Sequence, residues 1–392
     1  MNLDSFIKHI IIVLLPVQCV YFSCKSDKVA NNVIKMNEAQ IQTLYMSNYF
    51  ESIEYIPLET KSECLIGNNP ILYVTNEFIV TITSGNCFVF DRLSGLFLGK
   101  IGNRGRGPNE YSQTPQGIIV NEQEKTIFLG QGNRLIEYSL TDMSVNPQSI
   151  RVRPLLNDKL AYITKNIWVV ALLNVAGNNP NQLLFFDREG MIDSIPNHYF
   201  FTPKTNEVWI NPIENFFYRY DNDLYYKHLY NDTIFKIADK KLYPEWIFET
   251  KKSPQLLYQL RDNPSTLSKE MANYHLIYPI LETDQYLFFN VTYQNQRHTY
   301  LFDKKIHQLK ELENGGFIND IDAGLTFWPA FTNQNQDLVC AYHADILKEE
   351  ISLKGLNEQN DKDILGFKKL RTLVAQLNEE DNPIVVIVKL KK

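Results

Sequence analysis

The chain has 392 residues, which suits one large repeat domain or two ordinary domains. Hydrophobic residues make up 44% of the sequence and charged residues 21%, values typical of a globular protein with a sizeable core. The net charge of −6 argues against a nucleic-acid-binding protein, because such a protein carries a basic face. The 22 tyrosines and 23 phenylalanines favour strands over helices.

Residues 1–23 have the pattern of a signal peptide. Lys8 precedes a short apolar run that ends at Ser23-Cys24. This run is shorter than a transmembrane helix needs. A cysteine directly after a small residue in this position resembles the lipobox of bacterial lipoproteins. The resemblance implies cleavage before Cys24 and lipidation of that residue; the alternative is an ordinary secretory signal with an incidental cysteine. We expect the lipoprotein, with residues 24–49 as a tether and lead-in and Asn31–Gln42 as its polar part.

Groups of strand-forming segments recur along the rest of the chain. The clearest is Phe88–Tyr111, where a strand ends at Asp91-Arg92, a turn follows at Ser94-Gly95, and a second strand leads to a glycine-rich loop. Groups of this kind begin at Phe78, Thr126, Ile167, Leu224, Tyr286 and Leu338. Their spacing of roughly 40 to 60 residues is expected for four-stranded propeller blades with variable loops. The sequence therefore predicts an all-β fold, a six-bladed β-propeller over residues 50–392.

Two segments, at about residues 253–279 and 345–377, carry apolar residues at helical spacing. Long insertions in a repeat fold often cap, bind or gate something, and the alternative is that their apolar stripes only dock on the flank of the propeller. We predict short helical insertions at both places, with any specificity on their exposed faces.

The last strand-like run, Asn382–Lys389, follows the second insertion. A ring of blades needs a closed last sheet, because an open edge invites aggregation. We therefore expect this run to pair with Leu338–Tyr342, and the early strand Ser52–Leu58 to complete the same blade.

Several motifs between about residues 50 and 390 share the order found in one known family. They are Tyr55–Thr60, Lys100–Tyr111, Tyr230–Phe235, Phe317–Gly324 with Phe327–Pro329, and Asn382-Pro383. Together they resemble the six-bladed β-propeller lipoproteins of Gram-negative bacteria, which are distant relatives of NHL-repeat propellers. The resemblance implies an anchored, exported propeller, but most members of that family have no assigned activity.

The glycine-rich segment Gly102–Pro108 contains Arg104 and Arg106. Glycine permits conformations in which successive N–H groups bind an anion, and arginines would add charge. The glycine spacing does not fit the dinucleotide fingerprint. The structural alternative, which we favour, is a connection between blades in which Glu110 pairs with an arginine. Arg104, Arg106, Glu110 and Tyr111 remain the candidate ligand-binding residues.

A second candidate site lies at Asn319–Gly324, where Asp320 and Asp322 could supply oxygen ligands for a cation such as Ca²⁺. The segment lacks the further acidic positions of an EF-hand, and Asp and Asn before Gly often make turns instead. Trp328, nearby in sequence, could stack on a sugar ring or could simply pack between blades.

The seven histidines are scattered and form no HExxH motif, and the sequence has no GxSxG elbow. No cofactor is therefore predicted. We expect a binding or scaffolding module for a glycan or an envelope protein, lipid-anchored in the periplasm or outer membrane through Cys24, without nucleic acid as a partner. The alternative is a carbohydrate-active hydrolase or lyase with a site at the central channel. Two or more carboxylates or histidines with coupled pKa values at one end of that channel would favour catalysis.

Overall fold

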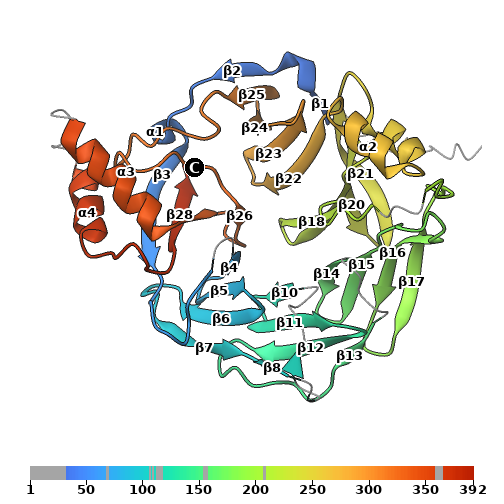
Figure 1. The fold of residues 1–392 in the computed structure, drawn as a ribbon, viewed down its shortest axis with the longest axis horizontal. Coiled ribbons are helices and arrows are strands. Elements are labelled where there is room, and N and C mark those ends of the chain that lie inside the picture. The colour runs from blue at the N-terminus through green and yellow to red at the C-terminus, as the bar shows by residue number, and fades with distance from the viewer. Residues whose placement is uncertain are drawn as a thin grey trace, which may run out of the picture.

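The computed structural model describes residues 32–67, 70–105, 107, 110–111, 118–152, 158–205, 209–357 and 365–392. In these ranges the strands form six large sheets that stand as blades around one axis (Figure 1). Four main strands of each blade are antiparallel neighbours, and the innermost of them borders the axis. The predicted all-β, six-bladed β-propeller is confirmed.

Blades one to five are simple meanders, in which each strand lies farther from the axis than the one before it (Figure 1). From the axis outward, the first blade has β4 (Ile71–Val74), β5 (Phe78–Thr83), β6 (Asn86–Asp91) and β7 (Phe97–Ile101), and the second has β10 (Ile118–Asn121), β11 (Thr126–Gln131), β12 (Arg134–Ser139) and β13 (Ile150–Arg151). The third blade has β14 (Lys159–Thr164), β15 (Ile167–Ala171), β16 (Asn181–Phe186) and β17 (Met191–Pro196), and the fourth has β18 (Asn215–Tyr220), β19 (Asp223–His228), β20 (Thr233–Ala238) and β21 (Lys241–Glu249). The fifth blade has β22 (Leu276–Glu282), β23 (Tyr286–Tyr293), β24 (Gln296–Asp303) and β25 (Gln308–Leu312).

The turn at Asp91 shows why the sequence folds locally in this way. The Oδ1 atom of Asp91 accepts hydrogen bonds from the backbone N–H of Ser94 at 2.8 Å and from its hydroxyl at 2.6 Å. Gly95 follows with φ of +70°, and a Cβ there would lie 2.1 Å from the carbonyl oxygen of Pro57. Only glycine therefore fits this turn, which returns the chain from β6 to β7.

The sixth blade contains both ends of the folded chain. From the axis outward it has β26 (Phe331–Thr332), β27 (Leu338–Tyr342), β28 (Ile384–Leu390) and β3 (Phe50–Pro57). In register, Val386 of β28 lies between Cys340 of β27 and Tyr55 of β3. The predicted closure of the ring is confirmed, and it leaves no edge open between the first and last blades.

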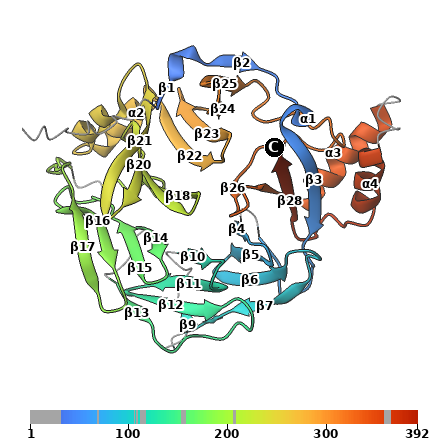
Figure 2. The same ribbon diagram turned by 180° about the vertical axis from the view of Figure 1, so that it is seen from behind.

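Part of the segment expected to be a polar tether is instead folded. Strand β1 (Val33–Lys35) pairs in parallel with β21, and β2 (Gln40–Gln42) pairs in parallel with β25. Both run along the outer rim of blades four and five, where they add a fifth strand (Figure 2). Ile34 explains the difference, because its side chain is fully buried between these blades while its two neighbours in β1 point to solvent. One inward-facing residue in a strand of three is too short a pattern to predict the strand from the sequence.

The helices lie outside the ring of strands (Figure 1). A 3₁₀ helix, η2 (Pro254–Leu260), and α2 (Pro264–Met271) fall within the first predicted insertion, whose last residues belong to β22. Helices α3 (Ala344–Asn357) and α4 (Leu365–Val374) fall within the second and bury apolar residues in the core of the sixth blade. Short elements complete the fold: η1 (Met36–Glu38), α1 (Met46–Tyr49), and the parallel pair β8 (Asn103–Arg104) and β9 (Glu110–Tyr111). Within the described ranges, no helix has both the length and the apolar character needed to cross a bilayer.

Candidate functional site

The glycine-rich loop connects the first blade to the second. Tyr111 is fully buried among the apolar residues between these blades, and its hydroxyl donates to the carbonyl of Ile101 at 3.3 Å. The carboxylate of Glu110 accepts the backbone N–H of Gly107 at 2.8 Å. Arg104 belongs to β8 by its backbone, and Arg106 lies outside the described residues. The described contacts are those of a connection between blades, and a ligand role for these four residues stays a prediction.

Asp320 and Asp322 both bind groups of the protein itself. The carboxylate of Asp320 accepts hydrogen bonds from the backbone N–H and the hydroxyl of Ser47, at 2.8 and 2.5 Å. Oδ1 of Asp322 accepts from the amide of Asn319 at 2.7 Å and from the hydroxyl of Tyr55 at 3.2 Å. In the described part of the chain, no group of three or more His, Cys, Asp or Glu side chains is placed to hold a metal ion. A metal at these two aspartates therefore stays a prediction.

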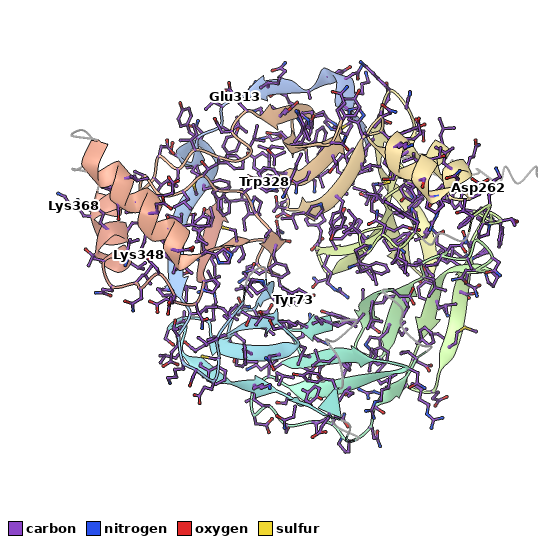
Figure 3. The ribbon with its side chains drawn as sticks, in the orientation of Figure 1. Tyr73, Asp262, Glu313, Trp328, Lys348 and Lys368 are labelled. Carbon is purple, nitrogen blue, oxygen red and sulfur yellow. The ribbon has the colours of Figure 1, made fainter. Side chains whose placement is uncertain are left out.

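Trp328 is half-buried and packs against the core between the fifth and sixth blades. Its ring is 6.0 Å from that of Phe288 and 6.2 Å from that of Phe317, measured between centroids. Figure 3 labels it in the interior of the ring, between the two blades. These contacts match the packing alternative. Cys24, the predicted lipidation site, lies outside the described residues.

A buried charged cluster, which no sequence motif indicates, lies between the third and fourth blades. Glu214, just before β18, forms an ion pair with Arg261, just after η2. The same carboxylate oxygen lies 3.2 Å from Nε2 of His228, the last residue of β19. All three residues are at most 5% exposed, so the charges of Glu214 and Arg261 are removed from water and depend on each other.

Tyr258 of η2 closes this cluster. Its hydroxyl lies 2.7 Å from Nδ1 of His228, and the backbone N–H of Tyr230 donates to the same nitrogen. The Tyr258 ring stacks on that of Tyr199 with a centroid distance of 3.7 Å and an angle of 5°. Because Nδ1 accepts both bonds, the imidazole proton belongs on Nε2, from which it is donated to Glu214.

A small pocket opens beside the cluster, with space for about one water molecule. It is lined by Leu172, Asn174, Gln182, Asn197, Tyr199, Glu214, His228, Tyr258 and Arg261. Asn174 and Asn197 use their amides within the loops, because Asn174 donates to the carbonyl of Tyr199 and Asn197 to that of Asn179. The pocket is thus a gap at a junction of loops that is too small for a ligand larger than water.

The order Tyr258, His228, Glu214 is that of a nucleophile, a base and an orienting carboxylate, but the electrostatics oppose such a role. Burial raises the pKa of Tyr258 well above its ordinary value, so its hydroxyl is held protonated. Burial also lowers the pKa of His228, against the opposing effect of Glu214. Burial acts to raise the pKa of Glu214, but the hydrogen bond from His228 and the charge of Arg261 outweigh it and lower that pKa. The cluster therefore fixes the first helical insertion to the blades.

Lys227, next to His228 in β19, is a second buried ionisable group, with 2% of its surface exposed. Its ammonium donates to two backbone carbonyls, those of His228 at 2.9 Å and Asn231 at 2.5 Å. Burial lowers the pKa of Lys227 to about 7, and the charge of Asp232 only partly opposes that effect. Asp232 in turn accepts the hydroxyl of Ser253 at 2.5 Å, so the same turn holds the start of the insertion.

The innermost strands carry a second feature, which we name the aromatic collar. Five of the six innermost strands carry half-buried aromatic rings, and we define the collar by one ring from each of them: Tyr73, Tyr162, Phe216, Tyr278 and Phe331; β18 also carries Phe217 and Tyr220. Strand β10 of the second blade contributes none. Figure 3 labels Tyr73 beside the centre of the ring. Because each ring is only half-buried, solvent reaches part of its surface.

Contacts within the collar cross from blade to blade. The ring of Tyr73 meets that of Phe331 edge-on at 5.7 Å, and Phe216 meets Tyr278 edge-on at 5.0 Å. The guanidinium carbon of Arg219 lies 3.8 Å from the centroid of Tyr162. Neighbouring blades thus hold these rings in fixed orientations at the axis.

Sequence reasoning missed both features, but the collar leaves a signal. Each of its rings lies five to eight residues before the second strand of its blade, from Tyr73 before Phe78 to Tyr278 before Tyr286. The charged cluster leaves none, since Glu214 and Arg261 are separated by 47 residues in sequence.

Comparisons with known proteins identify a family for the chain and one solved structure with the same fold. The family model described as "Domain of unknown function (DUF4934)" matches residues 31–389. A crystal structure of a Bacteroides fragilis protein, described as an exported protein, superposes with a TM-score of 0.72 at 18% identity, over 92% of this chain and 99% of that one. The extracellular domain of a one-component system from B. thetaiotaomicron gives a TM-score of 0.39 at 13% identity, over 74% of this chain and 32% of that one. None of the curated proteins matches the chain. The match to the family model covers nearly the whole sequence, and the chain therefore belongs to the DUF4934 family.

Proposed function

We propose that this chain is an exported, lipid-anchored binding protein whose aromatic collar binds a glycan. The observation that carries the proposal is that five of the six innermost strands, which border the axis, carry a half-buried aromatic ring. Binding sites for small molecules are lined by aromatic side chains with a few polar groups, and a ring face suits the apolar face of a sugar. The fixed edge-on pairs reduce the entropy lost on binding, because the rings are already oriented.

Binding is better supported than catalysis at this place. Among the innermost strands, which are all described, Glu282 is the only carboxylate. It is 3% exposed and lies 2.8 Å from the ammonium of Lys304. The hydroxyl of Tyr218 donates to its second oxygen at 2.7 Å. A glycosidase of the ordinary kind needs a pair of carboxylates across the scissile bond.

A glycan fits the collar better than an envelope protein does. The collar consists of single rings distributed around an axis, whereas a protein partner usually needs a continuous surface of about 800 Å² on each side. Exposed apolar residues of the kind that a protein partner covers occur elsewhere, for example Leu93, which is 80% exposed on the outer side of the first blade. Binding of a protein through that outer surface is the competing outcome of the test below.

Export and anchoring rest on the N-terminal pattern and on the exported relative from Bacteroides fragilis. The carbonyl of Asn32 accepts the N–H of Ile247 at 2.9 Å, so the chain is fixed to the rim of the fourth blade from that residue onward. Eight residues lead from Cys24 to Asn32, and a chain of that length spans at most about 28 Å. A lipid at Cys24 would therefore keep the rim of the fourth blade close to the membrane.

The test is a glycan array probed with the detergent-solubilised full chain, beside a variant with Tyr73→Ala and Tyr278→Ala. We expect the wild-type chain to retain a restricted set of glycans and the double variant to lose them. Equal retention by both chains would place binding away from the collar. No retention by either chain, together with capture of a purified envelope protein that depends on Leu93, would replace the glycan by a protein partner.

A further inference from the structure

The charges of the innermost strands are unbalanced at the axis. The six strands carry three charged side chains, which are Lys159 on β14, Arg219 on β18 and Glu282 on β22. Lys304 neutralises Glu282 at 2.8 Å. The remaining charge of the innermost strands is therefore positive and belongs to Lys159 and Arg219.

Arg219 is held at the axis by neutral groups. One Nη atom donates to the carbonyl of Asn222 at 3.1 Å and the other to the carbonyl of Tyr162. The carboxylate that acts on it through space, that of Asp223, forms an ion pair with Lys236. A guanidinium has five N–H donors, so Arg219 keeps donors for a further acceptor.

Lys159 lies at the same junction between the third and fourth blades. Ala161, two residues later in β14, packs in a core cluster with residues of the fourth blade, and strand alternation points Lys159 the same way. On β18, Phe217 packs against this cluster, so Arg219 points back toward the third blade. Burial lowers the pKa of Lys159, and no charged group of the described chain opposes that effect. Both cations are half-buried, and within the described residues neither forms an ion pair with a carboxylate.

We propose that this junction binds the acidic group of an anionic sugar, with Arg219 and Lys159 on the anion. The proposal rests on the proposed function, since it names the class of glycan that the collar takes. A half-buried cation without an acidic partner gains most from an anion that replaces its lost hydration. Carboxylated and sulfated sugars share this chemistry, and the experiment separates them.

The experiment is isothermal titration calorimetry on the full chain in detergent with three probes. They are a galacturonic acid oligosaccharide, its methyl ester, which has the same skeleton without charge, and a sulfated oligosaccharide of similar length. We expect the carboxylated or the sulfated probe to bind at least tenfold more tightly than the ester. Higher salt should weaken the binding of the charged probe and leave the binding of the ester unchanged.

Two variants test the residues, and a third is the control. Arg219→Gln and Lys159→Gln should each weaken the binding of the charged probe about tenfold and leave the binding of the ester unchanged. Lys165→Gln removes an exposed cation of the same blade, which pairs with Glu124 at 2.7 Å, and should change neither. Lys159→Gln keeps the test decisive if Arg219→Gln fails to fold.

The possible failures are distinct. If the ester binds as tightly as the acid and both variants bind normally, the anionic site is wrong while glycan binding stands. If the sulfated probe binds best and the variants weaken it, the site takes sulfated sugars. If all three probes fail and the array finds only neutral glycans, the anionic site is again wrong. If the array finds no glycan, the proposed function falls and this inference falls with it.

Discussion

Val386 in the last strand of the chain is the register partner of Tyr55 in the first long strand. This pair joins segments from opposite ends of the sequence, and the side chain of Val386 is fully buried. The sixth blade, and with it the position of every ring in the collar, depends on this pairing. The propeller cannot be complete until the C-terminal strand has been made.

Removing side-chain volume at this pairing should destabilise the whole ring. We expect Val386→Ala to lower the free energy of unfolding by about 2 kcal/mol, because a buried aliphatic group is lost and a cavity remains. Ile41→Ala is the matched control, since Ile41 is 68% exposed on β2, and it should change stability by less than about 0.5 kcal/mol. Urea unfolding followed by circular dichroism measures both. Equal effects would contradict the role given to the closing strand.

Arg261 should be essential for the buried cluster. Arg261→Met leaves the Glu214 carboxylate buried without its cation, and we expect a loss of about 3 to 5 kcal/mol in unfolding free energy. Adding Glu214→Gln to that variant should recover part of the loss, because no uncompensated charge remains. Lys204→Met is the control: its pair with Asp262 is on the surface, where Lys204 is 72% exposed, and the loss should stay below about 1 kcal/mol. A double variant no more stable than Arg261→Met would refute the electrostatic explanation.

Lys227 gives the protein a pH dependence with a definite sign. Its pKa is about 7 in the fold and about 10.4 in an unfolded chain, so between these values the unfolded chain holds the extra proton. Stability should therefore rise with pH from 7 to 10, by up to about 1.4 kcal/mol per pH unit from this group. Lys227→Met should remove that contribution, whereas Lys305→Met, at an exposed position, should keep it. Thermal unfolding across this pH range measures the slopes, and identical slopes in all three proteins would show that Lys227 is not the cause.

Anchoring through Cys24 is tested by fractionation of cells. Cys24→Ala should move the protein from the membrane fraction to the soluble fraction, because it removes the thiol that would carry the lipid. Cys19→Ala, in the apolar run, is the control and should leave the protein in membranes. A Cys24→Ala protein that stays with the membranes would contradict the anchor.

Strands that fill the interior of a blade could be predicted from the sequence, and strands at the margins could not. In β5 all six residues are buried, so the apolar run stands out, and the β-branched run of β28 does so too. The innermost strands are half-buried, and their mixture of aromatic, polar and charged residues, as in β18, hides them. Strands β1 and β2 have three residues each, too few to show a period. The turn at Ser94-Gly95 was predictable because its φ and its side-chain bonds are local.

The candidate sites follow the same division. Motifs that are contiguous in sequence, such as Gly102–Pro108, can be predicted as candidate sites, but the described contacts there involve the loop's own backbone. Glu214, His228 and Arg261 come from separate segments of the fourth blade and its insertion, and the rings of the aromatic collar come from five blades, so only the folded chain brings the members of each together. Geometry of this kind is a property of the fold and has no local pattern.

The most direct test is a crystal structure of the full chain with the glycan that the array retains best. We predict electron density for the glycan against the rings of Tyr73, Tyr278 and Phe331 at the axis. Density on the outer rim or on the helical insertions, with the collar unoccupied, would contradict the proposed function.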